Sequence, residues 1–241
     1  MTREGSQPFG ASRRGPLALT RVYRKPSDLP VAIPVFPLGG ALLFPRATLP
    51  LNIFEPRYLA MVDAALASHR LIGMIQPASM FGPNAPLDDD RPPLSQVGCA
   101  GRITAYQETE DGRYLIALTG IGRFRIGEEL AAGAPYRLAR VDWTPFAHDL
   151  AAATNILDDA ARARLQEALR AYLRRGEFKT DWAAVESAPL EALINSLSSG
   201  SPFSNSEKQA LLEARTLEDR CAALISLLQM ERPGQGGGYV Q

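Results

Sequence analysis

The sequence predicts an α+β protein in which a β-rich lobe, residues 29–148, precedes an α-helical lobe, residues 149–231. Within the first range, apolar residues alternate with polar ones or form short β-branched runs, which is typical of strands. Within the second, they recur every three to four residues, as on one face of a helix. Glycines punctuate the longest predicted strands, which indicates bulges where the sheet curls into a small mixed barrel. These glycines are Gly98, Gly101, Gly120 and Gly122.

The predicted strands follow one another with turn signals between them. Prolines interrupt the first two, so these strands must lie at edges or contain bulges. The third is short and almost wholly apolar, as in a strand buried on both faces. The fourth alternates, with Val97, Cys99 and Ile103 on one face, and an Asp-Gly turn at 110–113 joins it to its return strand. The strands in order are VAIPVFPL (31–38), ALLFPRATLPLNIF (41–54), LIGMIQP (71–77), VGCAGRITAYQET (97–109), YLIALTGIGRFRI (114–126) and YRLARVDW (136–143).

One helix is predicted inside the β-rich lobe, beginning within the stretch PLNIFEPRY. Pro56 suits the first helical turn, where its missing N–H costs no hydrogen bond, and Glu55 lies favourably at the positive end of the helix. Leu59, Val62 and Leu66 then recur at helical spacing. The stretch is therefore predicted to be a strand-to-helix junction.

Helical periods and capping residues define the second lobe. The first helix is predicted over 154–175, with Leu165 and Leu169 on its apolar face and arginines largely elsewhere. Pro233 and Gly234 end the last helix. Three further helix starts carry N-terminal signals: Ser187 as cap with Pro189 in the first turn, Ser204 and Glu207 in capping-box register, and Thr216 with Asp219 at the same spacing.

The two ends of the chain are predicted to be flexible. Residues 1–28 are polar, rich in glycine and proline, and basic, with six Lys and Arg against two acidic residues. Such a segment cannot bury enough apolar surface to offset its ordering entropy. The glycine-rich residues 232–241 are predicted to form a flexible tail for the same reason.

The composition is that of an ordinary globular protein without an overall charge. Lys plus Arg equals Asp plus Glu, 26 each, so no overall field draws the chain to nucleic acid or to anionic membranes. No window reaches the roughly 18 uninterrupted apolar residues of a membrane span, and prolines break the only stretch that imitates a secretory signal. Cys99 and Cys221 lie far apart in apolar patterns, as buried thiols of a reducing cytosol do. We expect a cytoplasmic protein without a membrane or nucleic-acid partner.

Motif searches find no catalytic constellation. The sequence lacks a Walker loop, a GxSxG elbow and metal-binding His spacings, and its two histidines, His69 and His148, are far apart. The acidic run 88–90 lies in a Pro-rich loop without the ligand spacing of a cation site. Ser206 and Lys208 are two residues apart at a helix start, so their side chains point in different directions. Catalytic residues, metal ligands and cofactors are therefore not expected.

Three apolar side chains on loops are candidates for partner contacts. Met80 and Phe81 lie in a long loop, and Phe203 precedes a capping box. Apolar loop residues either contact partners or pin their loop to the core, and the sequence leaves both interpretations open.

Arginines beside aromatic residues suggest a second kind of partner. Arg102, Tyr106 and the pair Arg123 and Arg125 lie on predicted strands, an arrangement that suits stacking on RNA bases. Alternating Arg and apolar residues are also typical of a half-exposed sheet, and this second interpretation is the simpler one.

Four segments in a fixed order resemble a known family. IPVFPLGGALLFP, LPLNIFEPRYLAMVDAAL, LIGMIQP and VGCAGRITAYQETEDGRYLIALTGIGRFRI are similar to the N-terminal substrate-binding domain of Lon protease. The downstream PFSNSEKQALLEARTLEDRCAALISLL is similar to the helical part of that domain. The resemblance runs from about Ile33 to Gln229, which is most of the chain.

The resemblance implies a PUA-like β pseudo-barrel followed by a helical lobe, in agreement with the two lobes derived above. It implies a non-enzymatic module that captures unfolded or tagged polypeptides, or an adaptor for a separate protease, because the motifs include neither the ATPase nor the peptidase of the family. RNA binding is the alternative function, since barrels of the PUA type recur in RNA-modifying proteins.

The motif positions are expected to hold the barrel together rather than to contact a partner, through a charge-assisted bond of Glu55 or Arg57. These family-signature positions are Phe54, Glu55, Pro56, Arg57, Tyr58, Gly122, Arg123 and Arg125.

Overall fold

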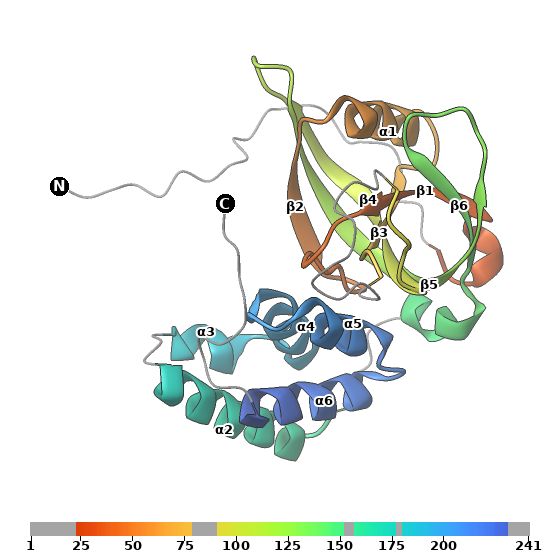
Figure 1. The fold of residues 1–241 in the computed structure, drawn as a ribbon. Helices are drawn as coiled ribbons and strands as arrows, with labels where there is room; N and C mark the ends of the chain where they lie inside the picture. The colour runs from red at the N-terminus through yellow and green to blue at the C-terminus, as the bar shows by residue number, and fades with distance from the viewer. Residues whose placement is uncertain (1–22, 79–90, 152–156, 177–179, 231–241) are drawn as a thin grey trace.

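The computed structural model describes residues 23–78, 91–151, 157–176 and 180–230. In these ranges six strands form one mixed sheet, and helices gather in a second lobe beneath it (Figure 1). The predicted α+β class, with a β lobe followed by a helical lobe, is confirmed. The strands are β1 Ala32–Pro37, β2 Thr48–Ile53, β3 Leu71–Ile75, β4 Val97–Glu108, β5 Tyr114–Leu130 and β6 Arg137–Asp142.

The sheet closes into a barrel because its longest strand has partners on both sides. The order is β2-β5-β4-β3-β1-β6, and β6 also pairs with the second half of β5, which closes the ring. β1 and β3 are parallel, whereas the other pairs are antiparallel. β2 pairs with the first half of β5 only and stays outside the closed ring.

A bulge lies where the glycines predicted one. Opposite Gly101, β5 skips a residue between Gly120 and Gly122, so the register shifts at this point of the β4–β5 pair. Elsewhere glycine makes room for a large side chain. A Cβ on Gly98 would lie 2.6 Å from the Phe124 ring, and one on Gly73 would lie 2.9 Å from it. Phe124 is thereby fully buried in a core cluster of the barrel.

Helix α1, Pro56–Leu66, begins where the sequence predicted. Glu55 is its N-cap in extended conformation and Pro56 occupies its first turn. Tyr58 and Met61 are buried, and the Tyr58 ring lies 4.2 Å from that of Phe36 on β1. Burial of side chains of this size stabilises the fold by about 1.5–3 kcal/mol each, which fixes α1 against the sheet.

The second lobe contains α2 Asp159–Gly176, α3 Trp182–Ser187, α4 Leu190–Gly200, α5 Asn205–Glu213 and α6 Leu217–Met230. Helices α4 and α5 lie next to the barrel, and α2 and α6 form a layer on their far side (Figure 1). One hydrophobic cluster runs from the strands through α4 and α5 into α2 and α6, so the two lobes share a core.

Two of the three predicted caps are confirmed and one is wrong. Ser204 and Glu207 form a capping box on α5, and Thr216 and Asp219 exchange the corresponding bonds at α6. Ser187 caps nothing: it is the last residue of α3, a helix too short to show a sequence period. The cap of α4 is Pro189 itself, and Ala188 before it is extended, as residues preceding proline are.

Part of the predicted flexible arm is folded. Tyr23 is buried beside the barrel, with Arg102 donating to its hydroxyl at 3.5 Å, and Pro26–Asp28 form the short 3-10 helix η1. The aromatic surface of Tyr23 supplies the burial that the polar composition of 1–28 did not suggest. No helix in the described ranges is long and apolar enough to cross a membrane.

Candidate functional site

Arg123 of β5 joins the two lobes. The residue is 1% exposed, and its guanidinium makes two bonds to the Asp149 carboxylate, Nε to Oδ2 at 2.8 Å and Nη2 to Oδ1 at 2.9 Å. It also donates to the carbonyl oxygens of Leu212, Ala214 and Arg215 at the end of α5. A helix C-terminus leaves carbonyls unpaired and carries partial negative charge, so a strand of the barrel caps a helix of the other lobe.

Asp149 is the buried partner in this junction and lies in η2, Thr144–Leu150, the 3-10 segment after β6. Burial alone would raise the pKa of Asp149, but the hydrogen bonds and the charge of Arg123 outweigh it, so the pKa lies below the ordinary value of 3.8. The carboxylate is therefore ionised at neutral pH, and Arg123 and Asp149 form a buried ion pair rather than a neutral hydrogen bond.

The lowered pKa of Asp149 predicts a loss of stability in acid. Its contribution is fully present above the unfolded pKa of about 3.9 and is lost as pH falls through the folded pKa. We expect urea unfolding to show a steeper fall of the free energy below pH 4 for the wild type than for Asp149→Asn, by up to about 1.4 kcal/mol per pH unit. Asp159→Asn, at an exposed carboxylate of α2, should parallel the wild type; equal slopes for all three proteins would contradict the assignment.

A second arginine, Arg220 of α6, reaches back toward the barrel. It donates to the Leu211 carbonyl at 3.1 Å and to Asn195 Oδ1 of α4 at 2.8 Å, and its guanidinium carbon lies 4.4 Å from the centre of the Phe44 ring. Burial, together with the nearby charge of Arg123, lowers the pKa of Arg220 to about 10, so it stays charged at neutral pH. The two arginines fix α4, α5 and α6 relative to the strands.

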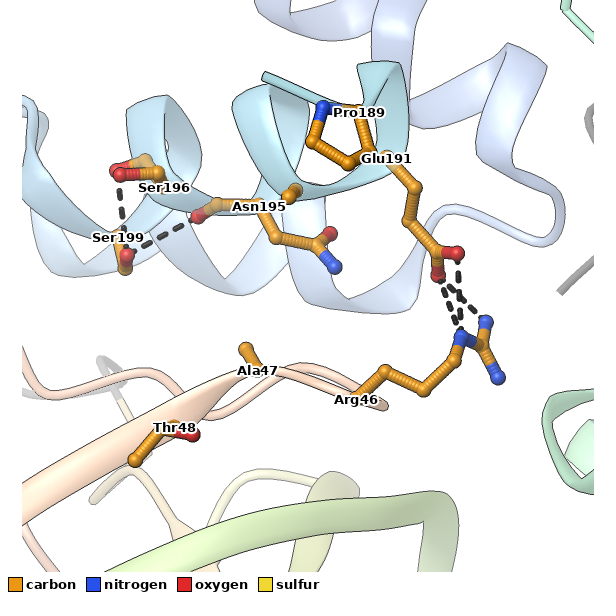
Figure 2. Close-up of a pocket in the computed structure, with 9 residues that line it drawn as sticks. Arg46, Ala47, Thr48, Pro189, Glu191, Asn195, Ser196 and Ser199 are labelled. Atoms are coloured by element: carbon orange, nitrogen blue, oxygen red, sulfur yellow. Dashed lines mark hydrogen bonds and ion pairs between the residues drawn. The ribbon is translucent and has the colours of Figure 1, made fainter. Parts of the chain in front are cut away.

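Beside this junction a groove opens between the start of β2 and one face of α4 (Figure 2). It encloses about 480 Å³. Residues of the barrel form one wall and residues one helical turn apart on α4 form the other, as Figure 2 shows. The lining is Arg46, Ala47 and Thr48 on the first side and Pro189, Glu191, Ala192, Asn195, Ser196 and Ser199 on the second.

Arg46 closes one end of the groove in a strained conformation. Its φ of 66° lies in the left-handed region, which costs a non-glycine residue about 1–2 kcal/mol. Its Nε lies 3.0 Å from Glu191 Oε1 (Figure 2). Its Nη1 donates to the Asp149 carbonyl at 2.8 Å. These contacts hold the strained turn in place and tie the rim of the groove to the buried junction.

The lining suits hydrogen bonding to uncharged polar atoms. Thr48, Ser196 and Ser199 supply hydroxyls, and Ala192 and Pro189 supply small apolar surface between them. The single cation and the single anion of the lining neutralise each other. None of the lining residues is a histidine or a cysteine, so the groove offers binding groups and lacks the usual partner that would activate a hydroxyl.

For Phe203, the structure favours one of the two interpretations that the sequence left open. Phe203 is 5% exposed and packs in the shared core, so it pins the turn between α4 and α5 instead of facing a partner. It lies directly before the capping box of α5, and its ring belongs to the hydrophobic cluster that the two lobes share. Met80 and Phe81 lie outside the described residues.

The family-signature positions divide into buried and exposed ones. Arg57 pairs with Glu55 at 2.8 Å, but both side chains are more than a third exposed, so the pair stabilises little. Tyr58 is buried, whereas Phe54 is 61% exposed and Arg125 is also exposed. The charge-assisted bond expected of Glu55 or Arg57 is present, since Arg57 Nε donates to Glu55 Oε2 at 2.9 Å, but the buried bond of this kind is made by Arg123 to Asp149. A Cβ on Gly122 would lie 3.4 Å from Leu150, an ordinary contact.

The residues weighed for catalysis are engaged elsewhere. Lys208 Nζ donates to the Gly40 carbonyl at 3.1 Å, while Ser206 Oγ lies 3.1 Å from Ser204 Oγ. Cys99 and Cys221 are free and buried, and burial raises the pKa of both thiols. The described ranges contain no group of three or more His, Cys, Asp and Glu side chains that could hold a metal ion.

Comparison with known proteins identifies relatives over most of the chain. Lon protease of Flavobacterium johnsoniae is 26% identical over 208 residues, 85% of this chain and 24% of the relative. Lon protease 2 of Sorangium cellulosum is 27% identical over 213 residues, 84% of this chain and 25% of the relative. The chain therefore spans about a quarter of the length of these relatives.

Two solved structures share the fold. The N-terminal domain of the Mycobacterium avium complex Lon protease matches with a TM-score of 0.58 at 20% identity, covering 83% of this chain and 99% of that one. A Lon N-terminal domain protein from Xanthomonas campestris matches with a TM-score of 0.53 at 20% identity, covering 81% and 97%. The model of the ATP-dependent protease La (LON) substrate-binding domain matches residues 32–230, so the chain belongs to this family.

Proposed function

We propose that this chain is a non-catalytic module that binds segments of unfolded or tagged polypeptides in the groove between β2 and α4. The observation that carries the proposal is the groove itself, a concave site of about 480 Å³ lined by hydroxyls and small side chains. Membership of the LON substrate-binding domain family supports polypeptide as the ligand. The same activity suits an adaptor that delivers the bound segment to a separate protease.

The size and rigidity of the groove support this choice of ligand. A site of this volume accommodates a few residues of an extended chain and excludes a folded domain. Its walls belong to different lobes, and these lobes are held in one arrangement by the bond of Arg123 to the end of α5 and the contact of Arg220 with the Phe44 ring. The neutralised pair of Arg46 and Glu191 gives no preference for charged ligands. We therefore expect weak binding with little sequence specificity.

Filling the groove should abolish most of the binding. Ser196 is exposed on the α4 wall, so Ser196→Trp places a large ring where the ligand lies. With reduced, carbamidomethylated α-lactalbumin as an unfolded probe, we expect fluorescence anisotropy to show an affinity at least about tenfold lower, equivalent to ~1.4 kcal/mol. The matched control is Ser226→Trp, the same change at an exposed serine of α6 away from the groove.

Three results distinguish the possibilities. Retained binding in Ser196→Trp would place the polypeptide site elsewhere on the surface. Equal losses in Ser196→Trp and Ser226→Trp would indicate a general effect of the added indole. A wild type that binds neither the unfolded probe nor native α-lactalbumin, but binds single-stranded RNA with a steep salt dependence, would replace the proposal with a nucleic-acid function.

A further inference from the structure

The strand that forms one wall of the groove has an unpaired edge. On one side β2 pairs with β5, from Thr48 opposite Thr119 to Ile53 opposite Tyr114. On its other side it has no strand partner in the described ranges, because it is the terminal strand of the order and lies outside the closed ring. Figure 1 shows β2 at the outer margin of the barrel, beginning above α4 and leading up to α1.

The direction of the backbone groups along β2 follows from its pairing. The Ala47 carbonyl accepts from Gly120 N–H at 2.8 Å and therefore points to β5. The direction of the backbone N–H and C=O groups alternates along a strand, so those of Leu49 and Leu51 also point to β5. Those of Thr48, Pro50 and Asn52 point to the free edge. Proline is tolerated in a sheet where its missing N–H would face away from a partner strand, in agreement with this assignment.

The free edge therefore offers N–H groups at Thr48 and Asn52 and carbonyls at Thr48, Pro50 and Asn52. All three side chains are exposed and uncharged. Thr48 also lines the groove, so the edge continues the wall of the groove without a break.

We propose that the polypeptide segment binds by adding to the free edge of β2 as an extra strand, with one end in the groove. This inference rests on the proposed function and specifies its mode of binding. In this mode of binding, backbone hydrogen bonds supply an affinity that does not depend on the ligand sequence. Pockets for every second side chain of the ligand supply the selectivity. The preferred ligands are uncharged segments of high β-propensity, the type that a folded protein buries and an unfolded one exposes.

Pro50 favours a foreign strand over a second copy of this chain as the occupant. Antiparallel pairing of two β2 edges centred on this position would place proline opposite proline, and both N–H donors of that pair would be missing. A strand from another protein would lack only one hydrogen bond, the one that an N–H at position 50 would donate. Proline on an exposed edge is a common protection against self-association, and here it leaves the edge available to another chain.

The test alters one backbone donor at the free edge. Asn52→Pro removes an N–H that β5 does not use, and Leu51 before it is already in a strand, a conformation that proline tolerates in the preceding residue. We expect the affinity for reduced, carbamidomethylated α-lactalbumin to fall by about three- to tenfold, as for one lost hydrogen bond, with an unchanged melting temperature. Asn52→Ala keeps the N–H and should bind like the wild type. Pro50→Thr restores a donor and should raise the affinity by a similar factor.

The outcomes separate this inference from the proposed function. If the wild type binds the probe, Ser196→Trp does not, and the Asn52→Pro and Pro50→Thr variants match the wild type, the groove binds polypeptide without strand addition and the inference is wrong. If the wild type does not bind the probe, the proposed function fails first. Concentration-dependent dimerisation of the wild type that Asn52→Pro abolishes, measured by light scattering, would identify a second copy as the occupant.

Discussion

Arg123→Met should lower the free energy of unfolding by about 3–5 kcal/mol, because it leaves the Asp149 carboxylate buried without its partner. The same change removes the donors that cap Leu212 and Arg215 at the end of α5. Methionine retains much of the aliphatic volume, so the loss reports the charge and hydrogen bonds rather than a cavity. Urea unfolding followed by circular dichroism measures it.

Two further variants show whether the loss has this cause. Arg125→Met changes the same residue type two positions along β5, at an exposed side chain, and should alter stability by less than about 0.5 kcal/mol. Adding Asp149→Leu to Arg123→Met removes the unpaired charge and should recover part of the loss. A double variant that is no more stable than Arg123→Met would mean that the caps on α5, and not the ion pair, hold the junction.

We expect the junction to maintain the groove as well, because the two walls of the groove belong to different lobes. If the Arg123→Met variant remains folded, its affinity for the unfolded probe should therefore be lower than that of the wild type. The affinity of Arg125→Met should be unchanged. The link is physical: Arg46 at the rim donates to the backbone carbonyl of Asp149, the residue whose side chain Arg123 holds.

Local patterns in the sequence predicted the elements of this fold well. The strand-to-helix junction at Pro56, the hairpin at 110–113 and the capping boxes at Ser204 and Thr216 depend on residues within a few positions of one another. Turn and cap chemistry acts at this range, so one sequence suffices to recognise it. The wrong cap at Ser187 arose because α3 is too short to show a period.

The candidate site could not be predicted in the same way, because its contacts join distant positions. Arg46 and Glu191 are 145 residues apart, and Arg123 and Asp149 are 26 apart. Arg123 and Arg125 are two positions apart on one strand, so the sequence suggested that both side chains lie on the same half-exposed face. In the structure, residues of η2 and the end of α5 cover Arg123, whereas Arg125 stays exposed to solvent. Burial of an arginine is decided by which backbone carbonyls the fold brings to it.

Gly120→Ala should be among the most destabilising single changes in the barrel, at about 3 kcal/mol, the upper end of the usual range for overpacking. A Cβ on Gly120 would lie 2.0 Å from the Phe44 carbonyl oxygen, a backbone atom that cannot rotate away. Gly120 is also hydrogen-bonded to both sides of the same turn, its N–H to the Ala47 carbonyl and its carbonyl to the Arg46 N–H, each at 2.8 Å. Separating the backbones enough to admit a methyl group must break these bonds.

Gly122→Ala is the matched control, two residues along in the same GIGRF motif. Its Cβ would lie 3.4 Å from the end of the Leu150 side chain, which can move. Alanine also lowers the conformational entropy of the unfolded chain, and this stabilising effect offsets the cost of the contact. We expect a change within about 1 kcal/mol by thermal and urea unfolding. Equal effects of the two changes would mean that the 44–47 turn is free to move. That turn carries strained Arg46 and leads into β2, so only Gly120→Ala should also weaken binding of the unfolded probe, by displacing one wall of the groove.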